Sequence, residues 1–242
     1  MSDGVQVPLE RTVVTRDQFA AAVVGAWPRI FGSEATDPAT SALWAQYQVE
    51  TGGRNCWNYN IGNVKKWPGD GFDWMCLHGV WEGVSPEAAD RLIREGVAKS
   101  DPSIDHARAV GAGRVSVLYE PPHPATRFRS YPSLDAAIFQ HIQVLALGRH
   151  AACWPFVLAG DVGGMATALH NSQYYTASRS AYAAGMLRPF GPFLSSDAFE
   201  KALAARLESL PKQAPTLDFQ AYDRATRPIV DDEDPSEPDP MS

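Results

Sequence analysis

The stretch QYQVETGGRNCWNYNIGNVK, residues 46–65, joins the end of an apolar helix to an aromatic loop rich in asparagine. The apolar spacing predicts a helix over residues 38–51, which the glycines at 52 and 53 end. Glu50 would then lie in the last turn, where the partial negative charge of unpaired carbonyl groups disfavours ionisation of a carboxyl group. The alternative is a solvated acid at a helix end. It does not explain why Glu50 would lie on the apolar side of its helix. Three aromatic residues are available to form an apolar wall that would raise the pKa of Glu50 further: Tyr47, Trp57 and Tyr59.

Helices predominate on both sides of this stretch. Thr15 and Gln18 form a capping-box pattern and predict a first helix. Capping residues and apolar stripes predict further helices over residues 85–101, from Ser133, over residues 161–172 and 178–187, and from about Ser196. Residues 54–84 read as short strands joined by turns, and residues 114–120 and 126–131 as a pair of strands.

This order of elements predicts an α+β fold, with a mostly helical lobe, a small β-rich lobe and a cleft between them. Residues 1–212 are expected to form a single domain. Residues 213–242 are polar, rich in proline and acidic, and we expect them to be a disordered tail. A docking function for this tail is the alternative.

The formal net charge of −7 comes mostly from the last twelve residues, DDEDPSEPDPMS, which contain six acids. Without them, 22 acidic residues face 21 basic ones, and no basic stripe is present, so we expect no nucleic-acid partner. No apolar run is long enough to cross a membrane, and the N-terminus lacks the features of a signal peptide. The chain is therefore expected to be made in the cytoplasm and to reach any external target by release or by a non-classical route.

The three cysteines have no metal-binding spacing, and the histidines are scattered, so no metal or other cofactor is expected. We expect the cysteines to be reduced and buried. Cys56, Cys76 and Cys153 would then all carry free thiols. The alternative is a disulfide between Cys56 and Cys76, which bracket the asparagine-rich loop.

Three blocks of the sequence resemble, in order, the bacterial glucosaminidase family of flagellar-rod peptidoglycan hydrolases and autolysins (glycoside hydrolase family 73). The first is QVETGG followed by NYNIGNVK, the second is FRSYPSLDAAIFQHIQVL (128–145), and the third is ALHNSQYYTASRSAYAAGM (168–186). The resemblance covers roughly residues 38–187. It implies a lysozyme-like fold and a substrate in the glycan strands of peptidoglycan.

The resemblance also implies roles for individual residues. Glu50 matches the general acid of the family, and Tyr175 matches a cleft tyrosine that orients substrate near that acid. Six residues would line the cleft and bind sugar groups: Trp57, Asn58, Tyr59, Asn60, Tyr174 and Tyr182.

The sequence departs from the family pattern in two places. Ser178 stands where the family has an aspartate, and residues 85–113 form an insert where the family has a simple hairpin. Two residues are therefore candidates for the second carboxylate of a glycosidase: Glu82, which we prefer, and Glu120. Asp70 and Asp73 lie in a turn-forming sequence and are weaker candidates.

The combined prediction is a peptidoglycan hydrolase that cleaves the β-1,4 glycan strand, most simply as an N-acetylglucosaminidase. Muramidase and lytic transglycosylase activities of the same fold are the alternatives, and so is a non-catalytic peptidoglycan-binding component of a phage tail or secretion apparatus. The expected partners are glycan strands, with a contractile injection or secretion apparatus and a cognate immunity protein as further candidates. An endolysin released on lysis and a bacteriolytic effector are both compatible with the missing signal peptide.

Overall fold

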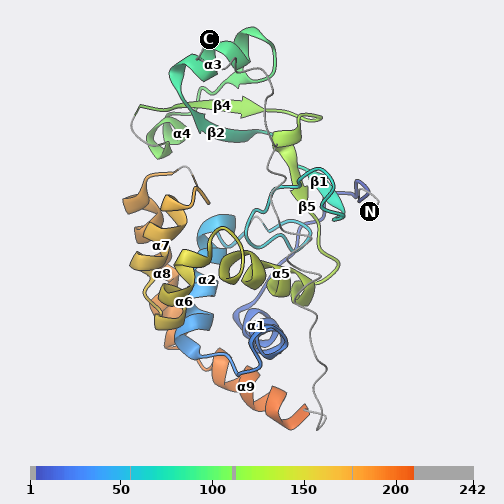
Figure 1. Ribbon diagram of the computed structural model, residues 1–242, viewed down its shortest axis with the longest axis vertical. Helices are drawn as coiled ribbons and strands as arrows, with labels where there is room; N and C mark the ends of the chain where they lie inside the picture. Colours follow the sequence, from blue (N-terminus) through green and yellow to red (C-terminus); the bar gives the residue numbers. More distant parts are fainter. Residues whose placement is uncertain (1–3, 55, 111–112, 176, 210–242) are drawn as a thin grey trace, which may run out of the picture.

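The computed structural model describes residues 4–54, 56–110, 113–175 and 177–209, and the predicted acidic tail lies outside these ranges. The described part has an α+β fold, as predicted, with a large helical lobe and a small β lobe (Figure 1). The helical lobe consists of α1 (Arg16–Phe31), α2 (Asp37–Thr51), α5 (Leu134–Ala146), α6 (Trp154–Ala159), α7 (Val162–Asn171), α8 (Arg179–Leu194) and α9 (Ala198–Ser209). The β lobe consists of β2 (Val80–Val84), α3 (Pro86–Arg94), β3 (Lys99–Ser100), α4 (Ile104–Ala109) and β4 (Val115–Tyr119). Strands β1 (Trp74–Cys76) and β5 (Arg127–Arg129) lie between the two lobes.

Helix α1 begins with the predicted capping box. The backbone N–H of Gln18 donates to the Thr15 hydroxyl at 3.2 Å, and the Gln18 side chain accepts from the Thr15 backbone N–H at 3.0 Å. These two bonds satisfy N–H groups that have no partner within the helix. The capping-box prediction is confirmed.

Helix α2 lies at the centre of the helical lobe and packs mainly against α8. The sequence predicted one broad apolar face, but every residue from Ala39 to Tyr47 is buried. Near the end of the helix, Gln48, Val49 and Glu50 are partly exposed, and Gly52 caps the helix in a left-handed conformation. Helix α2 therefore holds Glu50 at the edge of the core, where its side chain is partly buried.

The strand pairing differs from the prediction. Residues 126–131 were expected to pair with residues 114–120, but β5 pairs with β1 in an antiparallel two-stranded sheet. Strand β4 instead lies between β2 and β3, so both of its edges are occupied and none is left for β5. The insert supplies β3, which closes the second edge of β4.

Two predicted helices have different lengths in the structure. The helix that begins after Ser85 ends at Arg94, and residues 99–109 add β3 and α4. Helix α8 extends beyond the predicted end at residue 187 to Leu194, with Pro189 and Pro192 inside it. No single helix among the described residues is long and apolar enough to cross a membrane. Helix α5 and residues 151–159 together have the length and composition of a membrane span, but they are bent by 89° relative to each other.

The two lobes have separate cores. The helical lobe holds the large one, which includes Phe19, Leu43, Ile142 and Met165. In the described part of the chain, the core of the β lobe has four buried residues: Ala89, Ala98, Val117 and Tyr119.

Candidate active site

Glu50 lies partly buried in the last turn of α2, and two neighbouring side chains hydrogen-bond it. The Tyr182 hydroxyl donates to Glu50 Oε1 at 2.6 Å, and the Asn63 side chain also hydrogen-bonds Glu50, with Nδ2 at 2.5 Å from the backbone oxygen. Burial raises the pKa of Glu50 to about 7, although the hydrogen bonds from Tyr182 and Asn63 act to lower it. A carboxyl group with this pKa is present in both protonation states near neutral pH, as a proton donor in catalysis requires.

Tyr182 presents a protonated hydroxyl to this acid. The side chain is buried, and burial together with the negative charge of Glu50 raises the pKa of Tyr182 well above its usual value. Its ring stacks on that of Tyr175, with ring centres 3.7 Å apart and planes inclined by 6°. The Tyr175 hydroxyl donates to the backbone oxygen of Ala166 at 2.8 Å, which fixes the stacked pair against α7.

Gln46 and His141 lie beneath the acid, and the sequence did not single them out as site residues. Gln46 precedes Glu50 by four residues on α2, is fully buried and lies next to Tyr182. Its Oε1 lies 3.0 Å from Nε2 of His141, and burial lowers the pKa of His141 to about 4. A neutral His141 that donates from Nε2 to Gln46 fits this geometry. The i, i+4 spacing of Gln46 and Glu50 was a usable sequence signal.

Tyr174 supports the loop beside the acid. Its hydroxyl donates to the backbone oxygen of Gly62 at 2.8 Å. A Cβ atom at Gly62 would lie within 3 Å of both His141 and this hydroxyl, so only glycine allows the close approach. Tyr174 is partly buried, and its hydroxyl supports the loop at Gly62.

Asn58 and Asn60 use their side chains within the protein. Asn58 accepts from the backbone N–H of Glu10 at 2.8 Å and donates to the oxygen of Pro8 at 2.9 Å. Asn60 donates to the backbone oxygens of Val64 and Arg129, both at 2.9 Å, and accepts from the Val64 N–H at 2.8 Å. Both side chains are buried and hydrogen-bonded to backbone groups, which favours a structural role over sugar binding.

Trp57 and Tyr59 lie on the side of this loop that faces the N-terminal segment. Trp57 is partly buried and forms an antiparallel bridge with Arg11. Tyr59 lines a pocket of about 310 Å³ with residues of α1, among them Gln18, and with Leu134. Glu50 is not among the residues that line this pocket.

Glu82 lies on β2 and forms an ion pair with Lys65, with Nζ to Oε1 at 3.1 Å. Lys65 also donates to the backbone oxygen of Ala125 at 2.6 Å and lies over the Phe128 ring. Burial lowers the pKa of Lys65, and the charge of Glu82 acts in the opposite direction. Glu82 is thus held near the loop that contacts Glu50, but its carboxylate is paired with a cation.

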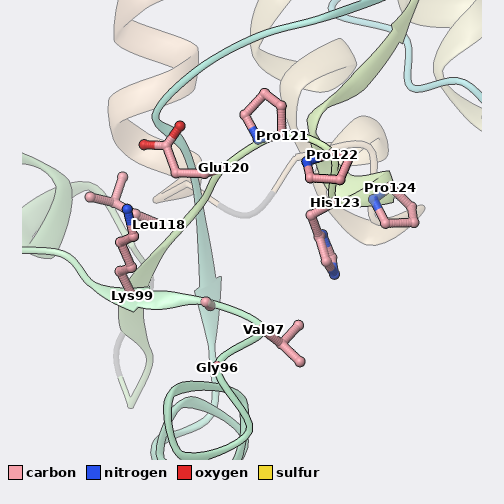
Figure 2. Close-up of a pocket in the computed structure, with 10 residues that line it drawn as sticks. Gly96, Val97, Lys99, Leu118, Glu120, Pro121, Pro122, His123 and Pro124 are labelled. Atoms are coloured by element: carbon pink, nitrogen blue, oxygen red, sulfur yellow. The ribbon is translucent and has the colours of Figure 1, made fainter.

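Glu120 lies at a different place in the β lobe. One of its carboxylate oxygens is 3.2 Å from Nδ1 of His78. It also lines a pocket of about 430 Å³, in which Figure 2 shows Glu120 and the residues up to Pro124 opposite Val97 and Lys99. Glu50 is not among the lining residues of this pocket.

Asp70 and Asp73 have structural contacts. Asp70 forms ion pairs with Lys66 at 2.6 Å and with Arg129 at 2.9 Å, which lower the pKa of its carboxyl group, although burial raises it. Asp73 accepts from the backbone N–H of Val5 at 2.9 Å.

Within the described ranges, no three His, Cys, Asp or Glu side chains lie close enough together to hold a metal ion. The cysteines are free; Cys56 and Cys153 are buried, and Cys76 is partly buried.

Neither known protein families nor curated proteins give a match to the sequence. Among solved structures, the fold is similar to a peptidoglycan hydrolase from Sphingomonas sp. A1, at 18% identity and a TM-score of 0.38, over 84% of this chain and 99% of that chain. A mutant of the Sphingomonas protein matches 78% of this chain and 93% of its own, at 18% identity and a TM-score of 0.35. These values are too low to transfer an activity or a residue role to this chain.

Proposed function

We propose that this protein cleaves the β-1,4 glycan strand of peptidoglycan, with Glu50 as the general acid. The observation that carries the proposal is the Glu50 carboxyl group, which lies in the last turn of α2 and accepts a hydrogen bond from the Tyr182 hydroxyl at 2.6 Å. Burial raises its pKa to about 7, so it can donate a proton near neutral pH. The substrate class rests on the three sequence blocks that resemble the glucosaminidase family.

In the proposed reaction, protonated Glu50 donates its proton to the glycosidic oxygen as the bond to the anomeric carbon breaks. The developing positive charge is on the sugar that loses this oxygen, and water attacks it. The Tyr182 hydroxyl holds the carboxylate that remains on Glu50, because a hydroxyl donor stabilises the ionised form. Tyr182 therefore favours the product state of the proton transfer.

The second carboxylate decides between related mechanisms. If Glu82 acts on water, it does so with its carboxylate held by Lys65 through Oε1. A lytic transglycosylase needs no second carboxylate, since a hydroxyl group of the substrate itself attacks the anomeric carbon. The Glu82–Lys65 ion pair is the observation that keeps this activity as a second candidate.

The experiment that tests the proposal is clearing of purified peptidoglycan by the wild type and by Glu50→Gln, with mass spectrometry of the released fragments. We expect Glu50→Gln to lose clearing by about a hundredfold or more, because general acid catalysis contributes factors of that size. The reducing ends name the bond: N-acetylglucosamine for a glucosaminidase, muramic acid for a muramidase and anhydromuramic acid for a lytic transglycosylase.

Two matched variants place the second carboxylate. If Glu82 acts on water, Glu82→Gln loses hydrolysis whereas Glu120→Gln keeps it. If neither the wild type nor any variant releases fragments but all of them sediment with peptidoglycan, the proposed chemistry is wrong and the protein is a binding component. The route by which the protein reaches the wall stays a prediction from the sequence.

A further inference from the structure

Gln46 and His141, the two buried side chains beneath Glu50, form a polar pair in which each side chain has an unused atom. Oε1 of Gln46 lies 3.0 Å from Nε2 of His141. Among the described residues, Nε2 of Gln46 and Nδ1 of His141 have no hydrogen-bond partner. An amide and an imidazole can bond in two directions, and the surroundings of these unused atoms decide which direction is present.

The proton of His141 lies on Nε2. Burial lowers the pKa of His141 to about 4, so the ring is neutral near pH 7 and has one N–H group. An amide oxygen only accepts hydrogen bonds, so the ring nitrogen that faces Oε1 of Gln46 must donate. A proton on Nδ1 would instead leave a buried N–H group without an acceptor among the described residues, which is costly. The Gln46 amide is therefore held with its oxygen toward α5.

The loop at Gly62 keeps the ring of His141 in this place. A Cβ atom at Gly62 would lie 2.4 Å from Cε1 and 2.6 Å from Nδ1 of His141, so the backbone packs directly on the ring. Two titratable groups lie near the ring, His150 and Tyr174. Burial lowers the pKa of His150 to about 4 and raises that of Tyr174 well above its usual value, so both are neutral near pH 7. Neither supplies a charge that would reverse the proton on His141.

The direction of this bond reaches Glu50 through Tyr182. With Oε1 bound to His141, the N–H groups are the part of the Gln46 amide that remains for Tyr182. The Gln46 side chain acts to lower the pKa of Tyr182, as a donor near a phenol oxygen does, although its Nε2 makes no hydrogen bond of full geometry with the described residues. The Tyr182 proton is left for Glu50 Oε1, at 2.6 Å. A Gln46 amide turned over would place its oxygen near Tyr182 and compete for that proton.

We propose that His141 is a positioning residue for the acid: it holds the Gln46 amide with its N–H groups toward Tyr182, so that the Tyr182 hydroxyl donates to Glu50. His141 acts through two other side chains. This inference rests on the proposed function for its role in catalysis, but the arrangement of the protons is measured without any substrate.

The tautomer of His141 in the wild type is the first test. Two-bond proton–nitrogen NMR spectra of the protein with isotope-labelled histidine distinguish a proton on Nε2 from one on Nδ1. The spectrum of His141→Gln identifies which signals belong to His141. We expect Nε2 alone to carry the proton near pH 7. A proton on Nδ1, or on both nitrogens, would overturn the proposal.

A pair of variants at position 141 then tests the link to Glu50. His141→Leu removes the donor, whereas His141→Gln keeps an N–H group at a similar reach from the backbone. The pKa of Glu50 is measured by carbon NMR of labelled glutamate, with Glu50→Gln to assign its signal. We expect His141→Leu to raise the pKa of Glu50 by about one pH unit, because Glu50 loses a donor that favours its ionised form. His141→Gln should restore the wild-type value, and an unchanged pKa in the leucine variant would contradict the proposal.

A double variant separates positioning from a general loss of packing. In a Tyr182→Phe background the hydroxyl is absent, so His141→Leu should cause no further shift in the pKa of Glu50. A further shift of similar size would show that His141 acts on Glu50 by another route, and the proposal would then be wrong. If His141→Leu does not fold, the tautomer of the wild type still decides.

The consequence for catalysis is a change in pH dependence. On a soluble glycan, the descending limb of kcat for His141→Leu should move to higher pH by about one unit, and KM should stay near that of the wild type. A changed KM with an unmoved limb would show damage to binding and would count against positioning. Absence of cleavage by the wild type would refute the proposed function alone, since the tautomer of His141 and the pKa of Glu50 are measured without substrate.

Discussion

At the scale of single residues, the environment of Glu50 combines opposing effects. Burial disfavours the charged carboxylate, while hydrogen bonds from Tyr182 and Asn63 favour it. Burial is the larger effect, so the pKa rises to about 7. The hydrogen bonds keep it from rising further, and both protonation states are populated near neutral pH.

Tyr182→Phe should shift the pH dependence of cleavage to higher pH. A general acid is active when protonated, so activity falls as pH rises through its pKa. The lost hydrogen bond stabilised the ionised form of Glu50, so its removal should raise this descending limb by about one pH unit. The measurement is the pH–rate profile on a soluble glycan.

The control for this profile is Tyr175→Phe, since the Tyr175 hydroxyl donates to Ala166 and not to the acid. Its descending limb should stay in place. A limb that moves equally in both variants would show that the stacked pair acts through packing alone.

Glu50→Gln should stabilise the protein at high pH. The pKa of Glu50 lies at its ordinary value in the unfolded chain and near 7 in the folded one, so the folded state holds the proton more tightly. Folding stability therefore falls as pH rises through this window, and the penalty is complete above about pH 7. A glutamine cannot ionise and so avoids this penalty. The free energy of unfolding of the variant should exceed that of the wild type by at most about 3 kcal/mol at high pH.

Urea unfolding at pH 8 and at pH 4 measures this effect. Glu50→Gln should be more stable than the wild type at pH 8, and the difference should shrink at pH 4, where Glu50 is protonated in both states. A constant difference at both pH values would contradict the raised pKa.

At the scale of elements, Asn60 fixes the loop between α2 and β1. Its side chain bonds three backbone groups, which belong to Val64 and Arg129. This loop carries Asn63 and Lys65, so its shape positions both candidate acids. The asparagine-rich pattern predicted a special loop, but its asparagines hold the backbone, and only Asn63 contacts the acid.

Asn60→Ala should lower the free energy of unfolding by about 3 kcal/mol, because buried backbone groups lose their partners. Urea denaturation measures the loss. Asn171→Ala, at an exposed position at the end of α7, is the control and should change stability little. A similar loss in both variants would show that the Asn60 bonds contribute nothing specific.

Element boundaries show why some features were predictable. The capping box of α1 and the glycine stop of α2 depend on residues a few positions apart, and both are observed. The pairing of β5 with β1 depends on which strand edges the insert occupies, which no local pattern contains. The burial of Gln46 beside His141, 95 residues away, is of the same kind.

At the scale of the whole molecule, the two lobes differ in the size of their cores. Native-state hydrogen exchange should therefore show slower amide exchange in α1 and α2 than in β2 and β4, because less buried apolar surface protects the β lobe. Mass spectrometry of the exchanged peptides measures this. Equal protection of both lobes would indicate that they unfold as one cooperative unit.

The α+β class, the helix whose last turn contains Glu50 and the choice of Glu50 as a candidate acid all followed from the sequence alone. These follow from apolar spacing, capping residues and the position of a carboxyl group in a last helical turn, which are local properties. The hydrogen bond from Tyr182 to Glu50 and the support that Asn58 and Asn60 give to the backbone became visible in the three-dimensional structure alone. Such contacts join residues far apart in the chain, and packing rather than local spacing decides which of them meet.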